Sequence, residues 1–243
     1  MFLLLGCAVA MLSFSSYKKG EQDCLQQIRD FYSTINSVSK QGITHISFSV
    51  KTIMRPSEKV DQPITNSEVE MFCSGNQSRY ISKEISVFED ETNSFTVIPN
   101  RKEIYWGNSV RNLEKDKRER KLFILQDTLF DLCTIKECKK IAATSEGCDQ
   151  LIVIGSNEKL KKIYDISTIS FWYNSSSKQV KKILIAYPNS IPIISMEANF
   201  KIMDYNYQGN DLSTSVKKLF IKSGDQLIEK YKGYKLIDNR IKN

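Results

Sequence analysis

The sequence is poor in histidine, glycine and proline, and it lacks the short motifs of common enzymes. Its one histidine, His45, falls on the polar side of an expected strand, where neither a catalytic triad nor a metal site can be built around it. GxSxG, HExxH and P-loop motifs are all missing. We therefore expect a protein that is not an enzyme, with no catalytic residues and no cofactor.

The low glycine and proline content also argues against a disordered chain. Only 10 glycines and 5 prolines occur among 243 residues, while 41% of the residues are hydrophobic, enough for a large core. Carboxylate pairs such as Glu68 and Glu70 lie two residues apart on an expected strand. Such pairs share one solvent side, so we interpret them as surface residues rather than as the acids of a glycosidase.

The cysteines do not have the spacing of a metal site. Cys133, Cys138 and Cys148 lack the two close pairs that structural zinc sites use, so we expect no metal. A disulfide from Cys148 to Cys133 or Cys138 is one alternative in an oxidising compartment, and buried thiols are the other.

An apolar stretch at residues 2–14 opens the chain and indicates export. It is shorter than the roughly 20 residues that span a bilayer, but it has the length of a signal-peptide core. Small residues at 13 and 15, the −3 and −1 positions, favour cleavage after Ser15, which predicts a signal peptide at 1–15 and one domain at 16–243. An uncleaved anchor and a buried N-terminus are the alternatives. Cys7 ends a lipobox-like segment and is a candidate lipidation site.

Positive charge is concentrated in the C-terminal third of the chain. Residues 158–243 hold 15 lysines and arginines against 8 acidic residues, whereas residues 1–157 are balanced and the whole chain carries +7. A basic region of this kind can meet an anionic membrane surface, or it can be a solvated lysine surface. The lysines alternate with strand residues rather than clustering on a recognition helix, so we do not expect nucleic-acid binding.

The hydrophobic pattern changes from a helical to a strand period early in the chain. Residues 23–40 have apolar residues three or four apart, typical of an amphipathic helix. Residues 44–54 alternate between apolar and polar, typical of a half-buried strand. Further strands are expected at 69–73, 79–89, 95–98, 103–106, 150–154, 168–173, 180–187 and 194–202, with one or two more at 227–237. Short helices are expected at 126–133 and after Ser215.

This order predicts an α+β protein with a single curved antiparallel sheet, an unclosed β-barrel whose concave face is covered by helices. The apolar side of such a sheet is either ordinary core or the lining of a groove for an acyl chain. The candidate groove residues are Ile46, Phe48, Val50, Val69, Met71, Met196, Phe200 and Ile202.

The exported N-terminus, the amphipathic first helix and the strand at 43–54 resemble the periplasmic lipoprotein-carrier superfamily. The segment Glu229-Lys230-Tyr231-Lys232-Gly233-Tyr234-Lys235-Leu236-Ile237-Asp238 is similar to the closing segments of Bacteroidetes-type members. The resemblance covers about residues 23–240. It implies a half-barrel, capped by helices, that shields lipoprotein acyl chains or other lipids.

We therefore predict an exported, monomeric lipid- or lipoprotein-binding carrier or chaperone of the bacterial cell envelope. It would act in the periplasm or at the periplasmic face of the outer membrane. The alternatives are an envelope structural module with a filled core, and an exported hydrolase, which would need convergent polar residues in one cleft.

Overall fold

The structure is a computed structural model that describes residues 19–38, 42–56, 63–109, 133–144, 147–156 and 165–240. The expected signal peptide with Cys7, and residues 126–132 of the second expected helix, lie outside the described residues. Cys133, expected at the end of that helix, instead begins strand β7 (Cys133–Lys140).

The first helix, α1 (Lys19–Val38), confirms the helical period of the sequence and begins a turn earlier than expected. Cys24, Ile28 and Phe31 are buried on one side of it, four and three residues apart. This is the apolar stripe that an amphipathic helix turns toward a core. No helix among the described residues is long and apolar enough to cross a membrane.

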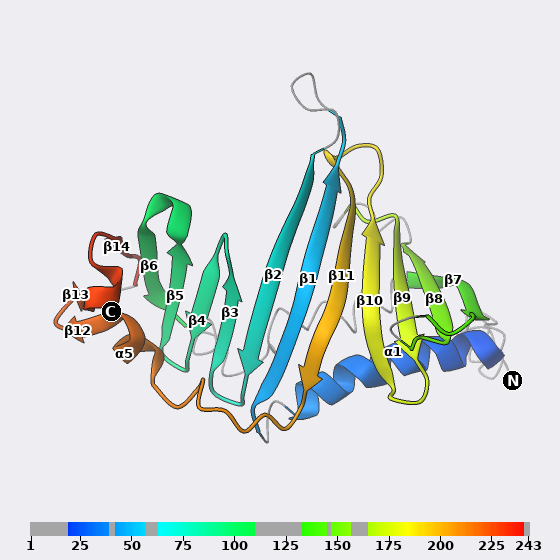
Figure 1. The fold of residues 1–243 in the computed structure, drawn as a ribbon, viewed down its shortest axis with the longest axis horizontal. Coiled ribbons are helices and arrows are strands. Elements are labelled where there is room, and N and C mark those ends of the chain that lie inside the picture. The colour runs from blue at the N-terminus through cyan, green and yellow to red at the C-terminus, as the bar shows by residue number, and fades with distance from the viewer. Residues whose placement is uncertain are drawn as a thin grey trace, which may run out of the picture.

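Twelve strands form one sheet in the order β14-β6-β5-β4-β3-β2-β1-β11-β10-β9-β8-β7 (Figure 1). Neighbouring strands run antiparallel, except β14 beside β6, which is parallel. Strands β14 and β7 are the two edges, so the sheet is not closed. Besides β7, the strands are β1 (Thr44–Met54), β2 (Ile64–Cys73), β3 (Ser78–Ser82), β4 (Ser86–Glu89), β5 (Asn93–Ile98), β6 (Glu103–Asn108), β8 (Gln150–Ser156), β9 (Thr168–Asn174), β10 (Gln179–Ala186), β11 (Ile193–Asp204) and β14 (Lys235–Asp238).

Most strands lie where alternation predicts them, and β1 has the expected bounds. The single strand expected at 79–89 is a hairpin of β3 and β4, because the polar run after Ile81 makes a tight turn. The Ser82 amide and hydroxyl both donate to the Ile85 carbonyl, at 3.0 and 2.8 Å. Strand β7 was not predicted.

A bulge in β11 reverses the faces of its side chains. Phe200 lies opposite Phe48 of β1, but Ile202 lies opposite Ser47, so Lys201 is an extra residue between them. Beyond the bulge Met203 replaces Ile202 on the face of Ile46.

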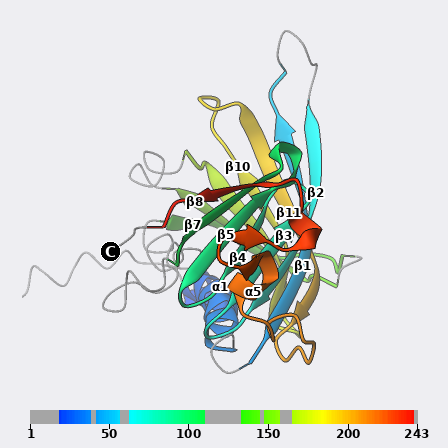
Figure 2. The same ribbon diagram turned by 90° about the vertical axis from the view of Figure 1, so that its left-hand side faces the viewer.

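The two faces of the sheet carry separate hydrophobic cores. We call the face of Ile46 the inner face and the face of its neighbour His45 the outer face. α1 packs on the inner face through Ile28 and Phe31, in a core that includes Ile46, Ile152 and Phe171. Figure 2, in which β1 and β2 lie on the right, shows α1 on the left, inside the bend of the sheet.

The second core lies on the outer face at the other end of the sheet. Phe95 of β5 shares a face with His45, because successive register pairs join Phe95 to Phe88, Arg79, Phe72 and His45. The short helix α5 (Val216–Phe220) packs on Phe95, Val97 and Trp106. The expectation that the helices cover the concave face is therefore wrong for α5, which lies on the opposite face from α1.

From α5 onward the chain forms a small layer over the second core. This C-terminal layer consists of α5, the β-ribbon of β12 (Ile221–Ser223) and β13 (Gln226–Leu227), and the 3-10 helix η2 (Glu229–Tyr231). Phe220 stacks between Phe95, at a ring-centroid distance of 4.5 Å, and Tyr231, at 5.0 Å. A layer of so few residues depends on this aromatic stack for its place on the sheet.

The outer face near His45 is less exposed than expected. The His45 side chain is only 12% exposed. Its ring stacks on Phe72 at 4.5 Å, and Tyr207, from the segment that follows β11, lies 5.0 Å away. The prediction of a surface histidine was wrong because the chain that leaves β11 crosses this part of the face.

The disulfide joins two elements that are far apart in the sequence. Cys24 of α1 is bonded to Cys138 of β7, and the side-chain amide of Gln150 lies within 3.4 and 3.3 Å of the two sulfur atoms. The expected pairing of Cys148 with Cys133 or Cys138 was wrong. Cys133 and Cys148 are both buried outside this bond, and burial raises the pKa of the Cys133 thiol to about 11.

Asp90 connects the β4–β5 turn to α5. Its carboxylate accepts hydrogen bonds from the amides of Thr92 (2.9 Å), Asn93 (2.8 Å) and Val216 (3.0 Å). Burial raises the pKa of Asp90, but these hydrogen bonds and one from the Thr92 hydroxyl outweigh burial and hold the pKa below its ordinary value.

Asp90→Ala is expected to lower the free energy of unfolding by about 2 kcal/mol at pH 7, because it leaves three amides without their acceptor. The folded-state pKa is depressed, so Asp90 stabilises the fold fully above its unfolded pKa of about 4, and this contribution disappears as the pH falls through the folded pKa. Urea unfolding at pH 7 and pH 3 measures both effects. A difference between wild type and variant that is unchanged at pH 3 would contradict the assignment.

Candidate functional site

Most of the candidate groove residues meet on the inner face at the middle of the sheet. Phe48 lies between Phe200 of β11 and Val69 of β2, and Ile46 lies opposite Met71. Side chains directly opposite in an antiparallel pair share a face. We call the following set the inner apolar strip: Ile46, Phe48, Val50, Val69, Met71, Met196 and Phe200.

Ile202 does not belong to this strip. The bulge at Lys201 turns Ile202 to the outer face, where it is 43% exposed. Met203 takes its place on the inner face and packs against the α1 core. Strict alternation along β11 cannot reveal such an extra residue, so this groove assignment was wrong.

Burial differs along the inner apolar strip. Ile46 and Val69 are 5% and 1% exposed, as expected for ordinary core. Phe48, Met71 and Phe200 are only partly buried and pack against the edge of the α1 core. The rings of Phe48 and Phe200 lie 5.4 Å apart and tilted, and they form the centre of the strip.

The position of α1 explains this gradient. Along the sheet α1 contacts β7 and β10, at the end that the disulfide also ties down. The strip lies farther along the sheet, on β11, β1 and β2, and of its residues only Ile46 belongs to the buried part of the α1 core. In Figure 1, α1 runs along the β7–β11 end of the sheet, and the other end extends well past it.

The sequence reading missed several residues that extend the inner apolar strip. Ile183 and Ile185 of β10 lie opposite Ala198 and Met196 of β11, and both pack partly buried against the α1 core. The alternation of β10 could have revealed both isoleucines. Ala198 lies between Ile183 and Val50 and is the smallest side chain in the row.

Two tyrosine hydroxyls beside the strip lie against methionine sulfur atoms. The Tyr187 hydroxyl donates to Met196 Sδ at 3.2 Å, and the Tyr205 hydroxyl approaches Met203 Sδ at 3.7 Å. Burial raises the pKa of Tyr205 to about 12 and also raises the pKa of Tyr187. Both tyrosines therefore stay protonated at physiological pH, and their surroundings suit an apolar ligand.

Metal-binding side chains do not converge within the described part of the chain, where no group of three or more His, Cys, Asp or Glu residues could hold an ion. The chemistry that the inner apolar strip can perform is apolar burial.

Comparisons with known proteins give only distant structural likenesses. No protein-family model matches the chain, and no curated protein matches it. Solved structures that it is similar to include an uncharacterized conserved protein from Thermus thermophilus, at 6% identity and a TM-score of 0.42, covering 88% of this chain and 100% of the other.

Two further similar structures come from other bacteria, and their names refer to lipoprotein sorting in one case and to the LolA superfamily in the other. One is a domain from Vibrio parahaemolyticus whose name assigns it to outer membrane lipoprotein sorting, at 7% identity and a TM-score of 0.35, covering 79% of this chain and 95% of the other. The other is a LolA superfamily protein from Nitrosomonas europaea, at 7% identity and a TM-score of 0.35, covering 80% and 97%. Likenesses of this size do not establish a family for the chain.

Proposed function

We propose that the protein is a non-enzymatic, exported carrier or chaperone that binds the acyl chains of lipids or lipoproteins in the bacterial cell envelope. The observation that supports this function is the half-buried middle of the inner apolar strip. Phe48, Met71 and Phe200 lie on the face that α1 covers and are only partly buried against its core. They belong to β1, β2 and β11, whereas α1 contacts β7 and β10 most.

The composition of the strip suits a flexible hydrocarbon ligand. Burial contributes about 0.8 kcal/mol for each methylene, so even a short acyl chain gains enough free energy to bind without polar contacts. Met71, Met196 and Met203 line this face, and unbranched methionine side chains adapt to chains of different shape. The ligand would lie across β10, β11, β1 and β2.

Ala198→Trp is expected to weaken binding of a fluorescent fatty acid at least tenfold, because the indole would fill the row between Val50 and Ile183. Fluorescence titration of the mature protein measures this affinity. The matched control is Asn199→Trp, one residue along β11, which points to the outer face opposite Ser49 and Lys182. The control should bind the probe within twofold of wild type.

Two outcomes would refute the proposal. Wild-type protein that neither binds the probe nor releases lipid on solvent extraction and mass spectrometry would favour the alternative, an envelope structural module with a filled core. Equal loss of affinity in both tryptophan variants would place the probe elsewhere. Thermal unfolding of each variant separates blocked binding from lost folding.

A further inference from the structure

The excess positive charge of the C-terminal third is not spread over the fold. Residues 165–215 hold four lysines and four acidic residues and are neutral. Residues 216–240 hold seven lysines and arginines against three acidic residues. Within the described residues from 165 onward, the excess therefore belongs to the C-terminal layer and the strand that follows it.

The lysines of the C-terminal layer lie close in sequence to residues that are buried in the second core. Val216 and Phe220 are buried, while Lys217 and Lys218 between them are exposed. Ile221 is buried and Lys222 is exposed, and Tyr231 is buried between two exposed lysines. The same packing that holds the layer on the sheet thus directs its lysines away from it. The exposed set is Lys217, Lys218, Lys222, Lys230 and Lys232.

Among the residues that the structure describes, few of these charges are neutralised. Lys232 pairs with Glu229 at 3.0 Å, but both side chains are mostly exposed, so the pair is weak. Arg240 forms an ion pair with Asp238 at 2.7 Å, and Asp225 lies 3.5 Å from the same guanidinium group. Lys217 and Lys230 lie over the rings of Trp106 and Tyr231, which hold their stems against the layer and leave the ammonium groups charged.

We propose that the C-terminal layer is a docking surface for an anionic lipid bilayer. Lysine ammonium groups act as mobile point charges and suit an array of phosphates that offers no fixed geometry, whereas recognition of a single phosphate or carboxylate favours the planar fork of arginine. The one arginine of this region, Arg240, is engaged by Asp238. Half-buried Leu219, Leu227 and Ile228 lie among the lysines and add apolar surface at headgroup depth.

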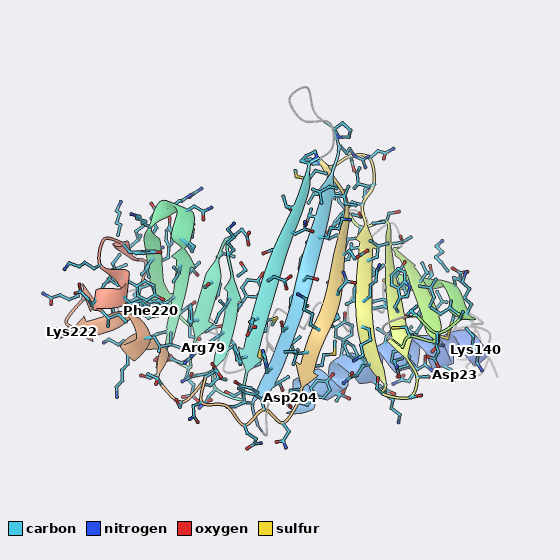
Figure 3. All side chains as sticks on the ribbon, viewed as in Figure 1. Asp23, Arg79, Lys140, Asp204, Phe220 and Lys222 are labelled. Atoms are coloured by element: carbon cyan, nitrogen blue, oxygen red, sulfur yellow. A yellow bond between two sulfur atoms is a disulfide. The ribbon has the colours of Figure 1, made fainter. Side chains whose placement is uncertain are left out.

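The surface is separate from the inner apolar strip: it lies on the opposite face and near the β14 edge, whereas the strip lies at the middle of the sheet. Figure 3 shows Lys222 at one end of the molecule and Lys140 of β7 at the opposite end. Vesicle binding by this surface can therefore be tested independently of acyl-chain binding.

Co-sedimentation of the mature protein with phosphatidylglycerol–phosphatidylcholine vesicles tests the proposal, with pure phosphatidylcholine vesicles as reference. Wild type should bind the anionic vesicles at least tenfold more tightly and should dissociate in about 0.5 M salt. The triple variant Lys217→Glu, Lys218→Glu, Lys222→Glu should lose at least about thirtyfold in affinity. All three side chains are exposed and only Lys217 also contacts a ring, that of Trp106, so the thermal unfolding of the variant should stay close to wild type.

The matched control makes the same charge change at the far end, with Lys136→Glu, Lys139→Glu and Lys140→Glu on β7. It should keep its affinity within about threefold. Equal losses in the two variants would mean that only net charge matters, and would overturn the assignment of the surface. If the wild-type protein binds an acidic polypeptide but does not bind anionic vesicles, the partner of this surface is a protein and not a membrane. Neither result depends on uptake of the acyl probe.

Discussion

Replacing both Cys24 and Cys138 with alanine is expected to lower the free energy of unfolding by about 3–5 kcal/mol. The disulfide joins residues 114 positions apart, and a cross-link that closes so long a loop removes much conformational entropy from the unfolded chain. It also ties α1 to an edge strand, which has a hydrogen-bonded neighbour on only one side. Urea unfolding of the mature protein in oxidising buffer measures the loss.

Reduction provides the control for this prediction. Wild-type protein treated with dithiothreitol should unfold at the lower urea concentration of the double variant, and the double variant itself should not respond. Cys133→Ala, which removes a buried thiol outside the disulfide, should cost less than the double replacement. A double variant as stable as oxidised wild type would show that the bond does not form in the folded protein.

Phe220→Ala is expected to cost about 3–5 kcal/mol, because its fully buried ring joins three others. Phe220 stacks on Phe95 and Tyr231 and meets Phe88 edge-on at 5.0 Å. Since Phe220 is the central ring of the aromatic stack between the layer and β5, the loss should release the layer from the sheet. Hydrogen exchange should rise in β5, β6 and α5 but remain unchanged in α1 and β8–β9, which belong to the other core.

Leu219→Ala is the matched control, since Leu219 is the next residue and is only partly buried against the same core. It should cost about 1 kcal/mol. Exchange that rises equally in both cores after Phe220→Ala would contradict the division of the sheet into two cores.

The sequence predicted the elements well because each depends on local alternation. The even positions of β1 from Thr44 to Met54, and the apolar residues three or four apart over residues 23–40, are visible without any partner. The antiparallel character of the sheet followed from the same patterns. The residues of the inner apolar strip were among the candidate groove residues of the sequence, together with Ile202, which the structure places on the outer face.

The failures share a physical cause, which is that they depend on pairing between distant segments. The bulge at Lys201 exists only in the register of β11 against β1, and it exchanges Ile202 for Met203 on the inner face. The partner of Cys138 lies on α1, and His45 is covered by Tyr207, which arrives from the end of β11.

The amino-acid sequence alone determined that this chain forms an amphipathic helix followed by a long antiparallel sheet. Only the tertiary structure decided which face each helix covers. Alternation gives every strand two sides but does not say which side meets which partner. The strand register puts Phe95 on the same face of the sheet as His45. Because α5 packs on Phe95, α5 and its lysines lie on the face opposite α1.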